Sequence, residues 1–353
     1  MSIAFFLSRK LTYRDTERFG FKKFKKEKVF IFDFSDLLKH KSKLFQTKTI
    51  RYKNYFIINN LSKLNYLLKK NDIKFGIDFL EKSFNDNFIR FFLFINKVKL
   101  IKYIVGLKSP IIYGKIKKNF SFKKTILNLL KKIINKTKIF LFKKIFSKIY
   151  WAVVISGKET NYYESFISDR IIKIYSHSLD YNNYLDLKNA SNKTKKIVTF
   201  VDQNLAFHQD FAIKNKKPIV GAKNYYYHLF KYFNFIEQKY KVKVVIASHP
   251  KKGSKNKYLT KSNFKIFFNK TPELIKQSKF IIMHYSTAVS YGILFKKPIL
   301  FITNNELKKN RQGYQINNMA KLLGSKIINI EKNFKKSKLK INLKKYKYFK
   351  DNY

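Results

Sequence analysis

Three histidines in the second half of this chain each follow a stretch that we expect to be a buried strand. His208 lies between Asp202 and Asp210, His249 precedes Pro250, and His284 precedes Ser286 and Thr287. A histidine at such a place can donate a hydrogen bond to an anion and is charged near neutral pH, which indicates phosphate binding or acid–base chemistry. The same three could bind zinc, but their spacing is loose for a metal site. Taken singly, each could also be an ordinary loop histidine.

The elements that must position these residues alternate between strand and helix. Continuous apolar runs predict strands buried on both faces at 195–203, 241–250, 279–284 and 298–303. Helical spacing and capping residues predict helices at 224–240, 271–278, 287–297 and 316–324. Such alternation builds a parallel, doubly wound sheet, and ligands bind such sheets at the carboxyl ends of the strands.

The turn that follows 279–284 shows why this placement matters. His284, Ser286 and Thr287 end a predicted strand and begin a predicted helix, where backbone N–H groups and the helix dipole attract phosphate. The two hydroxyls could hold a phosphate oxygen, or they could simply cap the helix. The sequence leaves both interpretations open.

The first half of the chain is harder to interpret. Strand-like runs at 2–8, 28–34, 55–59 and 170–178, with further candidates at 73–79 and 151–157, predict a second α/β domain. Residues 113–150 contain twelve lysines and no acidic residue, and apolar pairs alternate with lysine pairs at helical spacing. This segment is either a solvated helix pair packed on its domain or a basic amphipathic surface that lies on an anionic membrane leaflet.

The expected organisation therefore has three parts. We expect residues 1–190 to form an N-terminal α/β domain with the basic helical insertion at about 113–150. We expect residues 191–330 to form a Rossmann-like domain, and residues 331–353 a basic tail.

Composition limits the class of protein. The formal net charge is +56, from 77 Lys and Arg against 21 Asp and Glu, which favours anionic partners. Hydrophobic residues make up 45% of the chain, which argues against disorder. The absence of cysteine excludes disulfides and thiolate metal sites. We see neither a signal peptide nor an apolar stretch long enough to span a membrane, so we expect a cytoplasmic protein, peripheral at the inner face of the cytoplasmic membrane.

The order of these motifs resembles the GT-B architecture of glycosyltransferases, in particular the bacterial sialyltransferase and capsular-polysaccharide transferase group. "SHP" at 248–250 resembles the His-Pro motif of that group, and "HYSTA" at 284–288 is similar to its Ser/Thr motif. "FVDQN" at 200–204 stands where the acidic motif is expected, but Gln203 and Asn204 replace a second acid and a glycine. The likeness covers about residues 170–330.

The resemblance implies an α/β, GT-B-like fold in which two Rossmann-like domains face each other across a cleft. It implies that residues 1–190 are the acceptor-side domain and that residues 191–330 bind the nucleotide-sugar. It implies a glycosyltransferase of surface polysaccharide (capsule or lipopolysaccharide) biosynthesis that moves a sugar, sialic-acid-like in this group, from a CMP-sugar to a glycan or lipid-linked glycan. The nucleotide-sugar is a substrate, and no cofactor is expected. Asp202, His208 and Asp210 are the implied catalytic residues; the implied nucleotide-binding residues are His249, Pro250, His284, Ser286 and Thr287. No metal is expected, because the chain has no Asp-x-Asp triplet.

Several alternatives remain open. Within the same fold, the chain could be a UDP-sugar transferase, a non-hydrolysing 2-epimerase, a polyol-phosphate transferase or a catalytically inactive assembly subunit. An epimerase would need more carboxylates than the motifs supply. From another class, a basic nucleic-acid-binding protein fits the charge and the aromatic content. Against it, no recognised motif is present and the basic residues are spread along the chain, so we expect no specific nucleic-acid partner.

Overall fold

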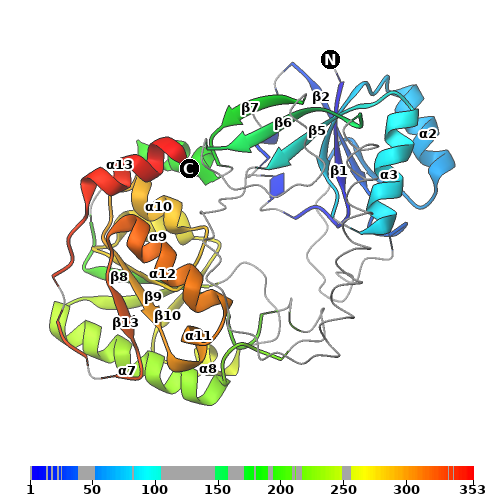
Figure 1. Cartoon of the computed structure of the whole chain (residues 1–353). Coiled ribbons are helices and arrows are strands. Elements are labelled where there is room, and N and C mark those ends of the chain that lie inside the picture. The colour runs from blue at the N-terminus through cyan, green and yellow to red at the C-terminus, as the bar shows by residue number, and fades with distance from the viewer. Residues whose placement is uncertain are drawn as a thin grey trace, which may run out of the picture. The chain divides into compact units, whose positions relative to one another are not determined.

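The computed structural model describes most of the chain. The described residues are 2–38 and 52–104 without 13–14, 17–18, 22–23, 25 and 82; 148–157; 171–189 without 179; 194–208, 211 and 217–248; and 256–353 without 333 and 337. They form two compact units, the first from residues up to Leu179 and the second from Asp180–Tyr353 (Figure 1). The basic segment at 113–150 lies outside the described residues except for its last three.

The first unit is built on a seven-stranded parallel sheet with the order β3-β2-β1-β4-β5-β6-β7. Its strands are β1 (Ser2–Leu7), β2 (Lys28–Asp33), β3 (Tyr55–Ile57), β4 (Phe75–Phe79), β5 (Lys99–Ile104), β6 (Tyr150–Ser156) and β7 (Ile172–Ser176). Its helices are α2 (Leu61–Lys70) and α3 (Phe84–Ile95). These bounds fit a domain in which consecutive strands are joined by crossover connections.

Successive residues of β1 serve opposite faces of this sheet, as the two-residue period of a strand requires. Phe6 belongs to the core beneath α2 and α3, together with Leu64 and Leu93. Phe5 belongs to the core on the other face. The Phe6 ring needs the glycine of the neighbouring strand, because a Cβ at Gly76 would lie 2.1 Å from Phe6 Cε2.

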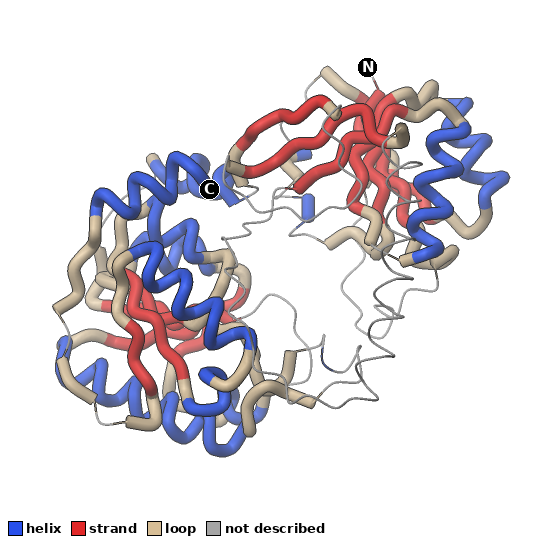
Figure 2. The backbone as a smooth tube through the Cα atoms, in the orientation of Figure 1, coloured by secondary structure: helices blue, strands red, loops and turns tan. Residues whose placement is uncertain are grey.

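The second unit is built on a six-stranded parallel sheet with the order β10-β9-β8-β11-β12-β13. Its strands are β8 (Ile197–Val201), β9 (Lys243–Ser248), β10 (Lys265–Phe268), β11 (Ile281–Met283), β12 (Ile299–Thr303) and β13 (Ile327–Asn329). Its helices are α5 (Asp180–Lys188), α7 (Ala222–Tyr240), α8 (Lys257–Thr260), α9 (Thr271–Gln277), α10 (Val289–Leu294), α11 (Asn305–Lys308), α12 (Arg311–Leu323) and α13 (Leu343–Asn352). Figure 2 shows the strands of each unit gathered as one sheet.

Helices cover both faces of the second sheet. Val244 and Ile246 of β9 belong to the core that holds the apolar side of α7. The alternate residues Val245 and Ala247 pack against Leu274 of α9 instead. The unit begins at α5 because that helix packs against α9 and α10, and α13 closes it by packing against α10 and α12.

The strand orders confirm the predicted α/β fold with two parallel, Rossmann-like sheets, the GT-B-like arrangement. Helix α10 is shorter than the predicted 287–297 at both ends. A turn at 286–288 precedes it, and it ends at Leu294, before Lys296 adopts a left-handed φ of +51°. In each sheet the strand order reverses beside the first strand: between β1 and β4, and between β8 and β11. None of the helices in the described part of the chain is long and apolar enough to span a bilayer.

Candidate functional site

The point where the strand order of the second sheet reverses brings two predicted site residues together. Val201 of β8 is the register partner of Met283 of β11. Asp202 and His284 follow these two residues, so they leave adjacent strands side by side. In open parallel sheets this reversal point is where ligands bind. The pairing of β8 with β11 thus brings Asp202 and His284, which are 82 positions apart in the sequence, next to each other.

Asp202 is held in a tight turn at the end of β8. Its side chain is buried, its backbone N–H donates to the carbonyl of Ala247 on β9 at 3.0 Å, and its Oδ1 accepts the backbone N–H of Asn204 at 2.8 Å. Asn204 has a φ of +50°, the left-handed conformation that glycine adopts most easily and asparagine tolerates. This conformation explains how an asparagine can stand where the resembled motif has a glycine.

Asn204 also connects this turn to α7 and α8. Asn256 Nδ2, at the start of α8, donates to Asn204 Oδ1 at 3.2 Å and to the hydroxyl of Tyr226 at 2.6 Å. The rings of Tyr226 and Tyr258 stack at 5.2 Å with an 11° angle between their planes. The turn at residues 202–207 is therefore held by polar and aromatic contacts.

His284 lies in the core below the end of β11. It has no exposed surface, and its Nδ1 lies 2.8 Å from the carbonyl oxygen of Ile302 on β12. A carbonyl only accepts, so Nδ1 carries the proton, and Nε2 accepts the hydroxyl proton of Tyr225 at 2.8 Å. Burial lowers the pKa of His284 to about 4, although the bond to Ile302 opposes this.

The expected charged histidine is therefore a neutral one at physiological pH. With both ring nitrogens bonded and no surface exposed, His284 joins β11 to β12 and to α7 in this structure. That places it as a positioning residue beneath the turn that carries Ser286 and Thr287. Tyr225, which the helical spacing assigns to the apolar stripe of α7, supplies a hydroxyl that the sequence pattern alone does not reveal.

The two hydroxyl residues differ in their surroundings. Ser286 is half-buried, and its Oγ accepts the backbone N–H of Ala288 at 3.2 Å, a local turn bond. Thr287 is exposed. The first backbone N–H groups of α10 are bonded within the turn, since Val289 donates to Ser286 O and Ser290 donates to Thr287 O. A ligand here would therefore meet the Thr287 side chain rather than a row of free N–H groups.

Of the remaining predicted residues, the structure describes only His208. His208 is half-buried, and its ring meets Phe211 edge-on at 6.0 Å. Asp210, His249 and Pro250 lie outside the described residues, and Ser248 is the last described residue of β9 before them. Within the part of the chain that the structure describes, no group of three or more His, Asp and Glu side chains is placed to hold a metal ion.

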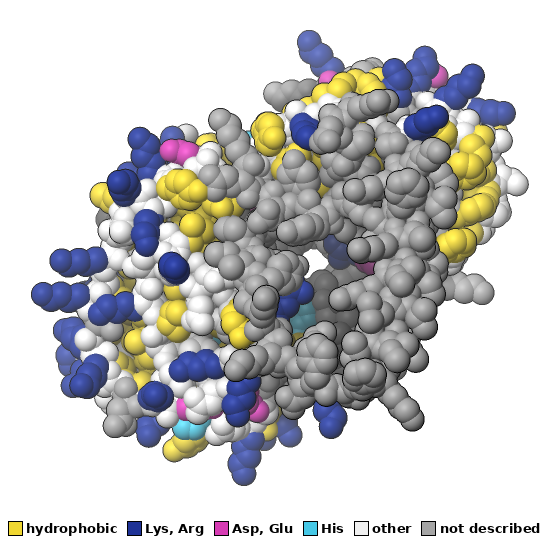
Figure 3. Space-filling view, in the orientation of Figure 1, with side chains coloured by type: hydrophobic (Ala, Val, Ile, Leu, Met, Phe, Trp, Pro, Cys, Tyr) yellow, Lys and Arg dark blue, Asp and Glu magenta, His cyan; other side chains and the backbone are white. Residues whose placement is uncertain are grey.

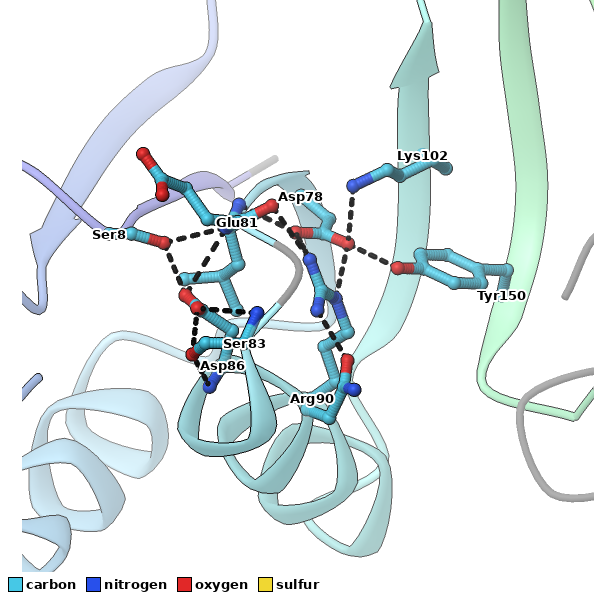
Figure 4. A network of polar contacts seen from close by, with 10 residues as sticks. Ser8, Asp78, Glu81, Ser83, Asp86, Arg90, Lys102 and Tyr150 are labelled. Carbon is cyan, nitrogen blue, oxygen red and sulfur yellow. Dashed lines mark hydrogen bonds and ion pairs between the residues drawn. The ribbon is translucent and has the colours of Figure 1, made fainter. Parts of the chain in front are cut away.

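The corresponding point in the first sheet, between β1 and β4, is filled by its own side chains (Figure 4). Asp86, in the first turn of α3, accepts hydrogen bonds from the hydroxyls of Ser8 and Ser83, and the backbone N–H of Glu81 donates to Ser8 Oγ at 2.7 Å. The Asp86 carboxylate sits where an anion would bind a helix N-terminus. This leaves the second sheet as the better candidate for a phosphate-bearing ligand.

A buried charge network stands beside that point and was not foreseen from the sequence. Asp78 of β4 has no exposed surface and accepts hydrogen bonds from Arg90 Nε at 2.8 Å, Lys102 Nζ at 3.2 Å and the Tyr150 hydroxyl (Figure 4). Burial by itself raises the pKa of Asp78, but Lys102 and Arg90 outweigh it and hold the pKa below its ordinary value. The network ties β4, β5, β6 and α3 together.

A cavity of about 1160 Å³ opens at the other end of the second sheet. Lys195, Lys243 and Lys265 line it at or just before the amino ends of β8, β9 and β10. It is rich in cations, but it lies at the opposite end from Asp202 and Thr287. In doubly wound sheets the amino ends are not the usual ligand site, so we place the site at the carboxyl ends.

Comparison with known proteins gives likeness in fold only. No family model matches the sequence, and no curated protein matches it. Among solved structures, the UDP-GlcNAc 2-epimerase of Methanocaldococcus jannaschii in complex with UDP-GlcNAc and UDP is 12% identical with a TM-score of 0.48, over 99% of this chain and 98% of that chain. MurG of Acinetobacter baumannii is 10% identical with a TM-score of 0.44, over 94% and 87%. HepE of Anabaena in complex with UDP-glucose is 10% identical with a TM-score of 0.44, over 93% and 85%. At these values no activity carries over to this chain.

Proposed function

We propose that this chain is an enzyme that uses a nucleotide-sugar and binds its nucleotide at the carboxyl ends of β8 and β11. The observation that carries the proposal is the pairing of β8 with β11, which sets Asp202 beside the turn of Ser286 and Thr287 at the reversal point of the sheet. The filled reversal point of the first sheet supports the same choice.

Glycosyl transfer is the reaction that we favour. As the sugar leaves, positive charge develops on its ring and negative charge on the departing phosphate, and the acceptor hydroxyl must lose its proton. Thr287 and Ser286, with His249 and lysine side chains in place of a metal ion, would stabilise the phosphate. Asp202, His208 or Asp210 would take the acceptor proton. The acceptor is a glycan or a lipid-linked glycan of a surface polysaccharide.

The nucleotide of the sugar donor is a separate question from the reaction type. The CMP-sugar expectation rests on the motif resemblance, and a UDP-sugar transferase or epimerase is the alternative on the same fold. UDP and UDP-GlcNAc are bound in the epimerase structure described above, so both belong beside CMP in the titration. Release of free nucleotide only when an acceptor is present would indicate transfer, whereas a changed sugar still bound to its nucleotide would indicate epimerisation.

The direct test is calorimetric titration with CMP, UDP, UDP-GlcNAc and GDP. His249→Ala should weaken nucleotide binding by about 1.5–3 kcal/mol, the usual loss when a hydrogen bond to a charged group is removed. Thr287→Val should weaken it by about 1 kcal/mol, because the variant keeps the shape and loses the hydroxyl. Lys265→Ala, at the opposite end of the sheet, is the matched control and should bind as the wild type does.

Two results would overturn the proposal. If Lys265→Ala abolishes binding while the strand-end variants leave it unchanged, the nucleotide occupies the cavity at the amino ends. If no nucleotide binds while arbitrary DNA does, with an affinity that falls steeply with salt, the chain is a nucleic-acid-binding protein.

A further inference from the structure

The outward face of α3 in the first unit is apolar along its whole length. Five large apolar side chains of this helix are exposed: Phe84 (78%), Phe88 (52%), Phe91 (42%), Phe94 (38%) and Ile95 (60%). Four of them, at positions i, i+4, i+7 and i+11, form one stripe on the helix surface, which we call the α3 stripe (Phe84, Phe88, Phe91 and Ile95). Figure 3 shows hydrophobic side chains gathered at the edge of the first unit where Figure 1 places α3.

The charged residues of α3 point the other way. The helix has only two, Asp86 and Arg90, and each is 2% exposed. Asp86 is bonded to Ser8 and Ser83, and Arg90 to Asp78 (Figure 4). A surface helix ordinarily turns its charges to water and its apolar stripe to the core. In α3 the two charged side chains face the core together with Ile89 and Leu93, and the phenylalanines of the α3 stripe face the solvent.

This arrangement is unusual for a chain of such charge. Lys and Arg supply 77 of the 353 residues, yet none lies on the outward face of α3. The lysines stand on the neighbouring helix instead: Lys63, Lys69 and Lys70 of α2 are exposed. Helices α2 and α3 share one core and lie next to each other in Figure 1. The α3 stripe thus lies on a helix whose neighbour carries exposed lysines.

We propose that the α3 stripe inserts into the interface of an anionic lipid bilayer while the lysines of α2 contact its headgroups. Transfer of exposed phenylalanines from water to the acyl boundary lowers the free energy of the system. Each lysine near the anionic surface adds electrostatic attraction between protein and membrane. A second copy of this chain is the poorer occupant, because two molecules that each carry +56 repel each other. Duplex nucleic acid would contact the lysines through its phosphates, but its base faces are stacked inside the helix, so it offers the phenylalanines little apolar surface.

The proposal depends neither on the nucleotide site nor on the segment at 113–150. Because the chain contains no cysteine, one introduced cysteine can be labelled selectively. A single cysteine at Phe88 can carry an environment-sensitive nitrobenzoxadiazole label. Tyr227 on α7, which is 63% exposed in the second unit, provides the matched control position.

The label at position 88 should shift to shorter wavelength on addition of phosphatidylglycerol vesicles and should be reached by quenchers in the acyl region. The label at position 227 should show neither effect. In flotation with unlabelled protein, Phe88→Asn should lower the vesicle partition coefficient about tenfold, the loss expected when one phenylalanine is no longer buried. Tyr227→Asn should leave it unchanged, and neither exposed replacement should alter the melting temperature.

Other outcomes would overturn the proposal. Equal binding of wild type and Phe88→Asn to these vesicles would show that charge alone drives adsorption. A shift at position 88 that grows with protein concentration in lipid-free buffer would show that the α3 stripe is an interface between copies of the chain. Equal binding to phosphatidylcholine vesicles would remove the anionic lipid from the proposal.

Discussion

The buried His284 predicts a particular dependence of stability on pH. Its pKa is lowered from 6.5 to about 4 by burial, and its neighbour Tyr225 stays neutral because burial raises the pKa of that hydroxyl. Below pH 6.5 His284 is protonated in the unfolded chain, whereas in the folded chain it stays neutral down to about pH 4. Acid therefore favours unfolding of the second unit throughout this window, and the full stability is present above pH 6.5.

The magnitude follows from linkage. When a single group binds a proton in the unfolded but not in the folded state, the free energy of unfolding falls by about 1.4 kcal/mol for each unit by which the pH is lowered. Between pH 6.5 and pH 4 the loss is roughly 3 kcal/mol, an appreciable part of the total for an ordinary domain. His284→Gln lowers stability at neutral pH because it disturbs two buried hydrogen bonds, but it removes this slope.

The assay is urea denaturation followed by circular dichroism at several pH values, on the wild type and on His284→Gln. Trp151, the only tryptophan of the chain, lies in β6 of the first unit and packs edge-on against Phe75, so its fluorescence reports that unit separately. We expect a wild-type slope in the second unit between pH 6.5 and 5 that the variant lacks. Equal slopes in the two proteins would mean that His284 is not a neutral, buried group, and the account of its hydrogen bonds would fail.

Three further predictions concern the first unit. Asp78→Asn should lower the unfolding free energy by about 3–5 kcal/mol, because Arg90 and Lys102 would remain buried without their counter-charge; an unchanged urea midpoint in the Trp151 signal would show that the network contributes little. In the wild type the stabilisation from Asp78 is present above its ordinary pKa of 3.8 and is lost as the pH falls below it, so the Trp151 transition should be acid-sensitive only in that lower range. Gly76→Ala should cost about 1–3 kcal/mol, because the new methyl would displace the Phe6 ring; a melting temperature equal to the wild type would contradict the close approach seen here.

The buried strands could be predicted from the sequence because strands covered on both faces are continuous apolar runs. Strands β8, β11 and β12, whose residues are almost all apolar and buried, show this plainly. Helix α3 was not predicted, because residues 84–95 have apolar side chains outside as well as inside and bury their two charged residues, the reverse of the usual pattern of a surface helix. Strand β5 was missed for a related reason, since the lysines at 99 and 102 interrupt its apolar run.

The candidate site could be predicted in part. The placement of Asp202, Ser286 and Thr287 at strand ends follows from the strand pattern alone. The state of His284 does not, because it depends on Tyr225 and Ile302, which reach it from α7 and β12. Burial of a histidine is a tertiary property, and a strand-end position in the sequence is compatible with either a core or a surface side chain.

The central claim is that the nucleotide occupies the carboxyl ends of β8 and β11. A crystal structure of the protein with the nucleotide that binds most tightly would test it most directly. We predict phosphate oxygens within hydrogen-bond distance of Thr287 Oγ1, beside the turn that begins at Asp202. Density for the nucleotide among Lys195, Lys243 and Lys265 at the amino ends, or in the first unit, would contradict the account.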